Sequence, residues 1–223
     1  MIVKIKRQAN AMATPYYQSF VYDGPKHVTI AAVLDALNYT DDLLDADGNA
    51  APRIRWECSC MQAVCGGCAM VINGVPALAC ATFADATSGD TILLEPLSKF
   101  PVVADLIVDR SAIYENLNRA KAYLSQLATS DKRHHKQQYS VAKCLKCGLC
   151  LEVCPNYHPG GAFFGAVLAN ESYLLATQAT DDTQAVEAYK THFGAGCSKA
   201  LSCQTVCPMG IETLTSILRM NRK

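Results

Sequence analysis

The sequence has no excess of charge of either sign and no long hydrophobic run. Among its 223 residues, 20 acidic side chains balance 20 basic ones. A neutral balance gives no support for nucleic-acid binding, because that function depends on a basic surface. No apolar stretch approaches the roughly 20 residues that a membrane-spanning helix needs. We therefore expect a soluble or peripheral protein with no nucleic-acid partner and no transmembrane segment of its own.

A dinucleotide fingerprint and a secretion signal are also missing. No G-x-G-x-x-G follows a predicted strand, so the chain is not expected to bind a dinucleotide itself. We find no signal peptide, so the twelve cysteines are expected to remain reduced, in the cytoplasm or an equivalent compartment. A disulfide scaffold is also disfavoured because a chain of this length can bury a core without cross-links.

The cysteines are arranged in runs with the spacing of iron–sulfur proteins. Residues 144–155 have the pattern C-x2-C-x2-C-x3-C-P, and residues 197–208 repeat it with Ala200 in place of the second cysteine. In two-cluster ferredoxins the first three cysteines of such a run bind one cluster, and the fourth binds the other. Structural zinc would explain a pair of C-x2-C units, but not this many ligand-spaced cysteines or two Cys-Pro endings.

The exchange of the fourth cysteines predicts two unequal cluster sites. One site keeps four thiolates and suits a [4Fe-4S] cluster. Its expected ligands are Cys144, Cys147, Cys150 and Cys207. The other site keeps three thiolates, because Ala200 has no thiol, and it suits a [3Fe-4S] cluster whose missing corner needs no protein ligand. Its expected ligands are Cys154, Cys197 and Cys203.

A third pattern lies in the first half of the chain, where C-x4-C-x2-C is followed by a lone cysteine. This is the spacing of plant-type [2Fe-2S] ferredoxins. The expected ligands are Cys60, Cys65, Cys68 and Cys80. Gly66 and Gly67 would let backbone N–H groups approach the cluster, and the Ser59 hydroxyl could donate to a cysteine sulfur. Cys58 does not fit the spacing and is expected to be a free thiol.

The periodicity of apolar residues predicts an α+β fold with two domains. Residues 1–100 are expected to form a ferredoxin-like β-grasp domain. Its expected elements are strands at Met1–Gln8, Tyr16–Tyr22, Cys68–Val75 and Thr91–Leu94, a helix capped by Thr29, and a hairpin turn at Asn73-Gly74. Residues 101–223 are expected to form an all-α ferredoxin-like domain that binds the two cubane-type clusters. Its expected elements are helices at Asp105–Tyr123, Ala162–Ala179, Thr183–Phe193 and around Ile211–Leu218, with a solvated linker at Thr129–Gln138.

Together these patterns resemble one protein family. The two-iron pattern from Arg55 through Cys80 is followed by a segment, Pro96–Asp109, that looks like the family's linker, and then by the two cysteine runs. Over nearly its whole length the chain resembles the iron–sulfur subunit of succinate dehydrogenase and fumarate reductase, of the complex II type.

The resemblance implies an electron-transfer subunit with no catalytic residues of its own. In such complexes the subunit passes single electrons between the covalent FAD of a flavoprotein subunit and a quinone at membrane anchor subunits. It implies that the [2Fe-2S] cluster lies nearest the flavin, the [4Fe-4S] cluster in the middle and the [3Fe-4S] cluster next to the quinone. It also implies a peripheral location, at the cytoplasmic face of the membrane, through these partners.

Several points stay open at the level of sequence. A related flavoprotein complex that uses a thiol, glycolate or glycerol phosphate would share this series of iron–sulfur clusters, although several such proteins append a further cysteine-rich domain. A free-standing multi-cluster ferredoxin is the other alternative, although such carriers are usually small and acidic.

Many quinone-reducing members of the complex II family have tryptophans after the third-cluster Cys-Pro, where this chain has Tyr157 and His158. Whether either contacts quinone, and whether succinate is oxidised or fumarate reduced, is not decided by the ligands.

Overall fold

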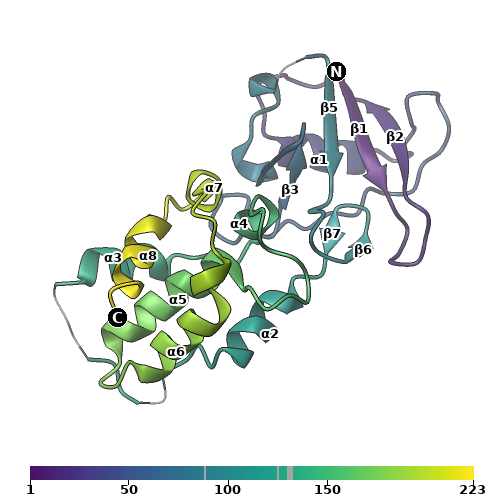
Figure 1. Cartoon of the computed structure of the whole chain (residues 1–223). Coiled ribbons are helices and arrows are strands. Elements are labelled where there is room, and N and C mark those ends of the chain that lie inside the picture. The colour runs from purple at the N-terminus through teal and green to yellow at the C-terminus, as the bar shows by residue number, and fades with distance from the viewer. Residues whose placement is uncertain (88, 125, 130–132) are drawn as a thin grey trace. The chain divides into compact units, whose positions relative to one another are not determined.

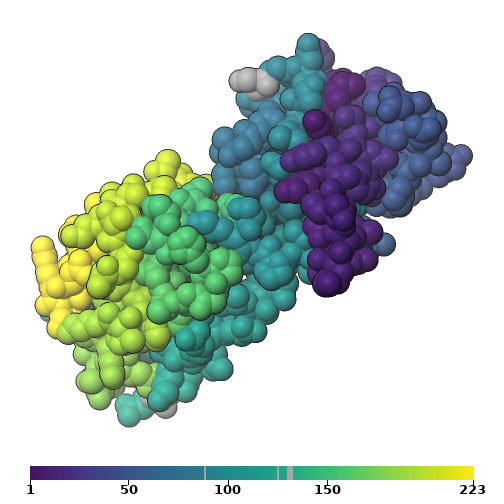
Figure 2. All heavy atoms as spheres, turned by 45° about the vertical axis from the view of Figure 1, so that its right-hand side comes forward, coloured from purple at the N-terminus to yellow at the C-terminus, as the bar shows by residue number. Residues whose placement is uncertain are grey.

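The computed structural model describes residues 1–87, 89–124, 126–129 and 133–223 (Figure 1). The chain divides into two compact units, Met1–Asp109 and Arg110–Lys223. The first unit contains the strands and one α-helix, whereas the elements described in the second are all helical. In the space-filling view the last residues of the chain, in yellow, lie at the surface of the second unit, and Asn221–Lys223 are exposed (Figure 2).

A five-stranded mixed sheet forms the N-terminal unit, in the order β2-β1-β5-β3-β4. Its strands are β1 (Ile2–Arg7), β2 (Tyr16–Val21), β3 (Ala69–Ile72), β4 (Val75–Leu78) and β5 (Thr91–Glu95). β1 pairs antiparallel with β2 and parallel with β5, while β3 pairs antiparallel with both β4 and β5. Asn73 and Gly74 join β3 to β4, and both have the positive φ that a two-residue hairpin turn requires. The predicted strands and hairpin are therefore confirmed.

An α-helix accompanies the sheet in the described part of this unit. In α1 (Ile30–Asn38) the Thr29 hydroxyl accepts a hydrogen bond from the Ala32 N–H at 3.2 Å, which is the predicted cap. The buried face repeats at helical intervals through Ile30, Val33 and Leu37. α1 contacts the short 3-10 turn Ala79–Ala81, which carries Cys80. The helix thus supports one end of the predicted two-iron site.

The N-terminal unit extends past residue 100, where the sequence placed the boundary. A small hairpin of β6 (Val102–Ala104) and β7 (Ile107–Val108) belongs to it. The predicted helix over Asp105–Tyr123 is wrong in its first part, since α2 (Ser111–Arg119) begins only after this hairpin. Asp105 turns the chain with φ 47°, a left-handed conformation that a non-glycine residue does not adopt inside an α-helix.

A buried ion pair between Asp105 and Arg7 holds the hairpin in place. The Asp105 carboxylate accepts the N–H of Gln8 at 2.9 Å and that of Arg55 at 3.0 Å, and it lies 3.1 Å from Arg7 Nε. The Arg7 guanidinium also donates to the carbonyls of Pro52 and Arg53 at 3.0 and 3.1 Å. Both charged side chains are almost fully buried, at 3% and 4% exposure. This network therefore fixes the segment that leads into the first cysteine loop.

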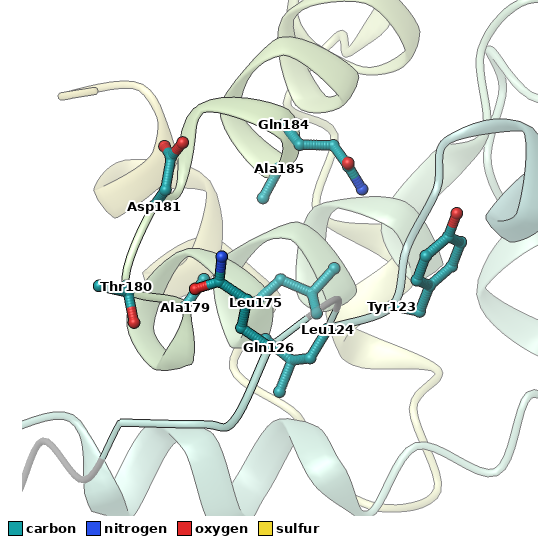
Figure 3. Close-up of a pocket in the computed structure, with 9 residues that line it drawn as sticks. All are labelled: Tyr123, Leu124, Gln126, Leu175, Ala179, Thr180, Asp181, Gln184 and Ala185. Atoms are coloured by element: carbon teal, nitrogen blue, oxygen red, sulfur yellow. The ribbon is translucent and has the colours of Figure 1, made fainter.

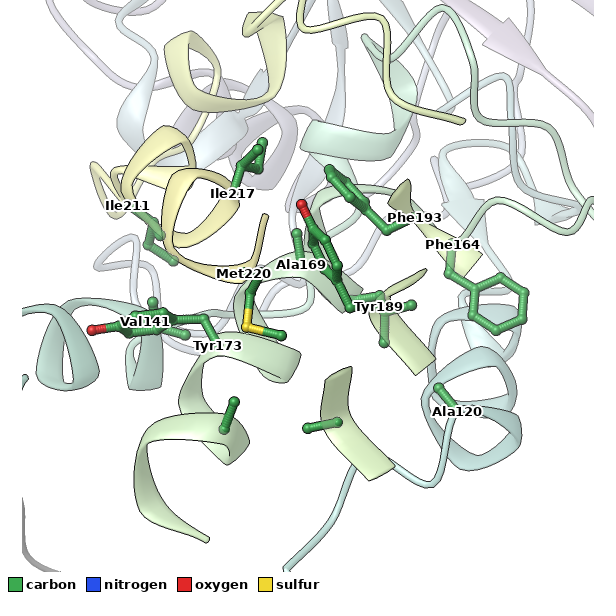
Figure 4. Close-up of a cluster of buried hydrophobic side chains, with 13 residues drawn as sticks. Ala120, Val141, Phe164, Ala169, Tyr173, Tyr189, Phe193, Ile211, Ile217 and Met220 are labelled. Atoms are coloured by element: carbon green, nitrogen blue, oxygen red, sulfur yellow. The ribbon is translucent and has the colours of Figure 1, made fainter. Parts of the chain in front are cut away.

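The C-terminal unit is built around α5 (Gly165–Gln178). The other helices in the described part of this unit are α2, α3 (His135–Ala142), α4 (Leu149–Glu152), α6 (Thr183–His192), α7 (Ser202–Thr205) and α8 (Thr213–Met220). α5 packs against α3, α4, α6 and α8. Its Tyr173 joins Tyr189 and Phe193 of the α6 region and Ile217 and Met220 of α8 in one apolar core (Figure 4).

The sequence predicts a solvated linker at Thr129–Gln138. Residues 130–132 of this segment lie outside the described part of the chain, and its last residues, from His135 on, form the first turn of α3. Across the described ranges, none of the helices combines the length and the hydrophobicity needed to cross a bilayer.

We predict that Asp105→Ala destabilises the N-terminal unit by about 3–5 kcal/mol, because it leaves the buried Arg7 charge without its carboxylate. The measurement is the denaturant midpoint of the cluster-loaded chain, followed by circular dichroism and by the visible colour of the clusters. Asp23→Ala, at an exposed position, is the matched control and should leave the midpoint nearly unchanged. Equal midpoints for the two variants would contradict the role given to the ion pair.

Candidate iron–sulfur cluster sites

The hairpin β3–β4 brings the first pair of predicted ligands together. Cys68 directly precedes β3, and Cys80 lies in the 3-10 turn after β4. Ala69 pairs with Leu78, and the Ala79 N–H donates to the Cys68 carbonyl at 3.1 Å. As a result the two sulfur atoms lie 3.2 Å apart, and both side chains are buried.

The other two cysteines of this site lie in a loop that coils back on itself. Met61, Ala63 and Gly66 have positive φ values of 54°, 59° and 78°. A left-handed conformation costs a non-glycine residue roughly 1–2 kcal/mol, so this loop needs compensating contacts. The residues that carry the sulfurs, Cys60 and Cys65, are half-buried and exposed, respectively. The site therefore has one buried pair of cysteines and one pair near solvent.

Backbone N–H groups of the loop point at the sulfur atoms and supply these contacts. The N–H groups of Gln62 and Val64 each lie 3.4 Å from Cys60 Sγ. They lower the pKa of the Cys60 thiol to about 7, because N–H donors favour the thiolate. Two further bonds in this loop run from Gly67 to Cys65 Sγ at 3.5 Å and from Ala63 to Cys80 Sγ at 3.3 Å.

Two sequence expectations at this site concern Ser59 and Cys58. No hydrogen bond from the Ser59 hydroxyl to a cysteine sulfur occurs in the described part of the chain, so the donors that surround the sulfurs are backbone groups instead. Cys58 is an exposed thiol. Its pKa is raised by partial burial and by the nearby charges of Asp35 and Cys65, so it lies beside the site.

The two cysteine runs of the C-terminal unit fold in the same way. Lys146 and Gly148 of the first run, and Lys199 and Leu201 of the second, have positive φ. Each run then enters a one-turn helix, α4 or α7. The residues that cap the ends of these helices, Val153 and Val206, both have φ −81° and ψ −10°. Ala200 therefore occupies the place in the second run that Cys147 has in the first.

The four cysteines predicted for the [4Fe-4S] cluster line one cavity. They are Cys144, Cys147, Cys150 and Cys207, and Cys203, which is predicted to bind the other cluster, lines the same cavity. Apolar walls come from Leu145, Ala166, Val167 and Ile211. Burial raises the pKa of the Cys147 thiol to about 11, and burial together with the surrounding cysteines raises that of Cys150 well above its usual value. The fourth cysteine of the second run thus lies with the first run.

The three cysteines predicted for the [3Fe-4S] cluster also lie together. The pKa of Cys203 is raised to about 11 by burial and by the charges of Cys154 and Cys197. The Lys199 N–H lies 3.4 Å from Cys197 Sγ, in the same geometry as the N–H groups around Cys60. Ala200 is exposed and brings no sulfur to this site.

Sequence reasoning missed an ion pair and a buried asparagine beside the four-iron candidate site. Lys146 forms an ion pair with Glu171 of α5, and both side chains are largely buried, at 20% and 15% exposure. Asn170, next to Glu171, is buried and lines the cavity. A signal for Asn170 exists in the sequence, since it interrupts the apolar run Ala166–Ala169 at the face of α5 that carries Val167.

Another hollow of the C-terminal unit contains no cysteine. It lies at the end of α5 and the start of α6, and the residues that line it are Tyr123, Leu124, Gln126, Leu175, Ala179, Thr180, Asp181, Gln184 and Ala185 (Figure 3). None of the predicted ligands contributes to it.

The donor set at all three places fits iron–sulfur clusters. Thiol sulfur is the one ligand type, backbone N–H groups bond to it, and the four-iron cavity has mostly apolar walls. Within the described residues, no three Cys, His, Asp or Glu side chains surround a point at which a single metal ion would fit.

Comparison with protein families gives matches to both halves of the chain. A model of a 2Fe-2S iron–sulfur cluster binding domain matches residues 2–115. Models of a 4Fe-4S dicluster domain match residues 140–211 and 110–158. These matches confirm the predicted α+β fold class, in which a two-iron domain precedes a helical two-cluster domain.

Comparison with individual proteins gives full-length relatives. The succinate dehydrogenase iron–sulfur subunit of Bacillus subtilis is 32% identical over 98% of this chain and 90% of its own length. The fumarate reductase iron–sulfur subunit of Escherichia coli is 29% identical over 96% of this chain and 89% of its own. A chain of the solved Mycobacterium smegmatis Sdh1 complex has the same fold, with a TM-score of 0.81, 20% identity, and coverage of 99% of this chain and 93% of that one.

We predict that Gly165→Ala disturbs the four-iron site more than Gly160→Ala does. Both glycines have positive φ, so each substitution costs roughly 1–2 kcal/mol in backbone strain. A Cβ at Gly165 would also overlap Leu151, between Cys150 and Cys154, which adds about 1–3 kcal/mol of overpacking, whereas Gly160 faces open space.

The measurement is the thermal midpoint of the C-terminal unit together with iron content per chain. Gly160→Ala is the control for the backbone contribution alone. If the two variants lose iron and thermal stability to the same extent, the close approach of Leu151 to Gly165 has no part in shaping the site.

Proposed function

Because the chain belongs to the family of iron–sulfur subunits of succinate dehydrogenase and fumarate reductase, we propose for it a definite set of cluster ligands, partners and a cellular location. It is an electron-transfer subunit of an oxidoreductase of this family, and its cofactors are [2Fe-2S], [4Fe-4S] and [3Fe-4S] clusters. The relatives do not favour a complex that uses thiols, glycolate or glycerol phosphate, or a free-standing ferredoxin.

The proposed ligands follow the three groups of cysteines. Cys60, Cys65, Cys68 and Cys80 would hold the two-iron cluster, and Cys144, Cys147, Cys150 and Cys207 the four-iron cluster. Cys154, Cys197 and Cys203 would hold the three-iron cluster. The observation that carries this assignment is that two cysteine runs of one geometry differ at a single ligand position, Cys147 against Ala200.

The protein's own contribution to electron transfer is to position and shield these sulfurs. When bound, the clusters supply one-electron steps that connect a two-electron flavin to a quinone. The loop N–H groups around Cys60 and Cys197 stabilise negative charge on sulfur. The apolar side chains around Cys150, such as Val167 and Ile211, exclude water from the middle site, which helps to set its potential.

The proposed partners are an FAD-containing flavoprotein subunit and membrane anchor subunits that bind quinone. Through them the chain would be peripheral, at the cytoplasmic face of the membrane. Tyr157 is buried, at 1% exposure, whereas the neighbouring His158 is exposed. Of these two residues, His158 is therefore the one that an anchor subunit or its quinone can reach without rearrangement of this loop.

We predict that Ala200→Cys converts part of the three-iron cluster to a four-iron cluster, because a thiolate then stands where Cys147 stands in the equivalent run. The added ligand brings negative charge, so the reduction potential of that site should fall. The measurement is the EPR signal of the oxidised three-iron cluster, which should decrease. Ala200→Ser, which adds a hydroxyl of similar size, is the control, and an undiminished signal in Ala200→Cys would count against the assigned geometry.

The function itself is tested by purifying the chain with its partners and adding succinate or fumarate. Succinate should reduce the clusters through the flavoprotein, and fumarate should reoxidise them, as followed by EPR. The relative rates of the two reactions would give the direction that the ligands leave open.

Two variants make this test specific to the chain. Cys60→Ser should weaken or abolish the two-iron signal and slow electron transfer to the other clusters, whereas Cys58→Ser, two residues away, should not. Clusters that stay oxidised in the complex with succinate and stay reduced with fumarate would exclude the proposed function.

A further inference from the structure

Asn170 is a buried polar side chain at the proposed four-iron site. It is 4% exposed and borders the cavity lined by Cys144, Cys147, Cys150 and Cys207. Ala166 and Val167, one turn earlier on α5, line the same cavity. This face of the helix is therefore directed at the cysteines, and Asn170 is the amide that it carries there.

One end of the Asn170 amide is bonded and the other is not. Nδ2 lies 3.1 Å from Oγ1 of Thr213, which is itself 2% exposed and lines the cavity. Within the described residues Oδ1 has no hydrogen-bond partner. A buried acceptor without a donor costs about 1–3 kcal/mol. The cost rises when the cysteines bind iron, because thiolates are negative and repel an amide oxygen.

Exchanging the positions of Oδ1 and Nδ2 removes both problems. Oδ1 then accepts the hydrogen of the Thr213 hydroxyl, which a hydroxyl can donate as readily as it accepts. Nδ2 takes the place of the unpartnered oxygen and has an N–H free to donate, in a residue that lines the cysteine cavity. The two ends of an asparagine amide have nearly the same shape, so their hydrogen-bond partners decide which way the amide points.

We propose that the Asn170 amide donates a hydrogen bond to a sulfur of the four-iron cluster, and that Thr213 fixes its orientation. This proposal rests on the proposed four-iron site. An N–H donor interacts more strongly with the reduced cluster, which has one more negative charge, than with the oxidised one. Asn170 therefore raises the reduction potential of this cluster, because hydrogen bonds to the sulfurs are one of the factors that set it.

The first test is a redox titration of the whole complex, with the four-iron midpoint read by EPR. Asn170→Leu removes the donor at similar volume and should shift this midpoint to lower potential. Asn170→Asp keeps the bond from Thr213 but replaces the donor by a charge of the same sign as the cluster, so its shift should be larger. The two-iron midpoint should not change, and the three-iron midpoint should shift by less than the four-iron midpoint does.

Ser172→Ala is the matched control, since Ser172 is a buried polar residue of α5 that does not line the cavity. It should leave all midpoints unchanged. Thr213→Val should lower the four-iron midpoint by less than Asn170→Leu does, because the donor remains while its orientation is no longer fixed. If Asn170→Leu prevents assembly, Asn170→Asp decides the question, as it preserves both shape and the Thr213 bond.

A second readout is independent of potential. Pulsed EPR of the reduced complex, with asparagine labelled by 15N in its side chain, should detect a coupling to the four-iron cluster that is lost in Asn170→Leu. An unchanged midpoint in both Asn170 variants, or the same coupling with and without Asn170, would overturn the proposal. Absence of a four-iron signal in the unaltered protein would instead overturn the ligand assignment on which it rests.

Discussion

The structure depends on the bond between a backbone N–H group and a cysteine sulfur. For the N–H of one residue to reach the sulfur two positions earlier, the chain must reverse sharply, as it does from Cys60 to Gln62 and from Cys197 to Lys199. Left-handed residues between or beside the cysteines make this reversal, including Met61 and Lys199 themselves. Such loops are strained without a cluster to surround, and the cluster-binding function explains why the strain is tolerated.

Rigid elements at the ends of these loops provide the necessary support. In the N-terminal unit, the hairpin β3–β4 joins Cys68 to Cys80, and the buried pair of Arg7 and Asp105 fixes the approach to Cys60. In the C-terminal unit, α5 forms the apolar wall behind Cys150 and belongs at the same time to the aromatic core. The two-iron and four-iron sites are therefore supported by a hairpin, a buried ion pair and a helix that are held by contacts other than those to the cysteines.

Local signals explain how much of this could be predicted from the sequence. The Thr29 cap, the Asn73-Gly74 turn and the cysteine spacings each act within a few residues, and the strands, the long helices and the three gatherings of cysteines follow from them. Asp105 was misjudged because its partners, Gln8 and Arg55, are far away in the sequence, while the apolar residues after it recur at helical intervals. Asn170 has a local signal, since it is the polar residue that follows the apolar run Ala166–Ala169, but its orientation depends on a bond to Thr213 that spans 43 positions.

The one-turn helix α4 has a consequence for the two cubane sites. Cys150 lies within it and Cys154 two residues beyond its end, yet the two sulfurs face different groups of cysteines. With the proposed ligand sets, a single helical turn would therefore separate the four-iron cluster from the three-iron cluster. In that arrangement a substitution in α4 would alter the surroundings of both clusters, because the same turn carries a ligand of one and leads directly to a ligand of the other.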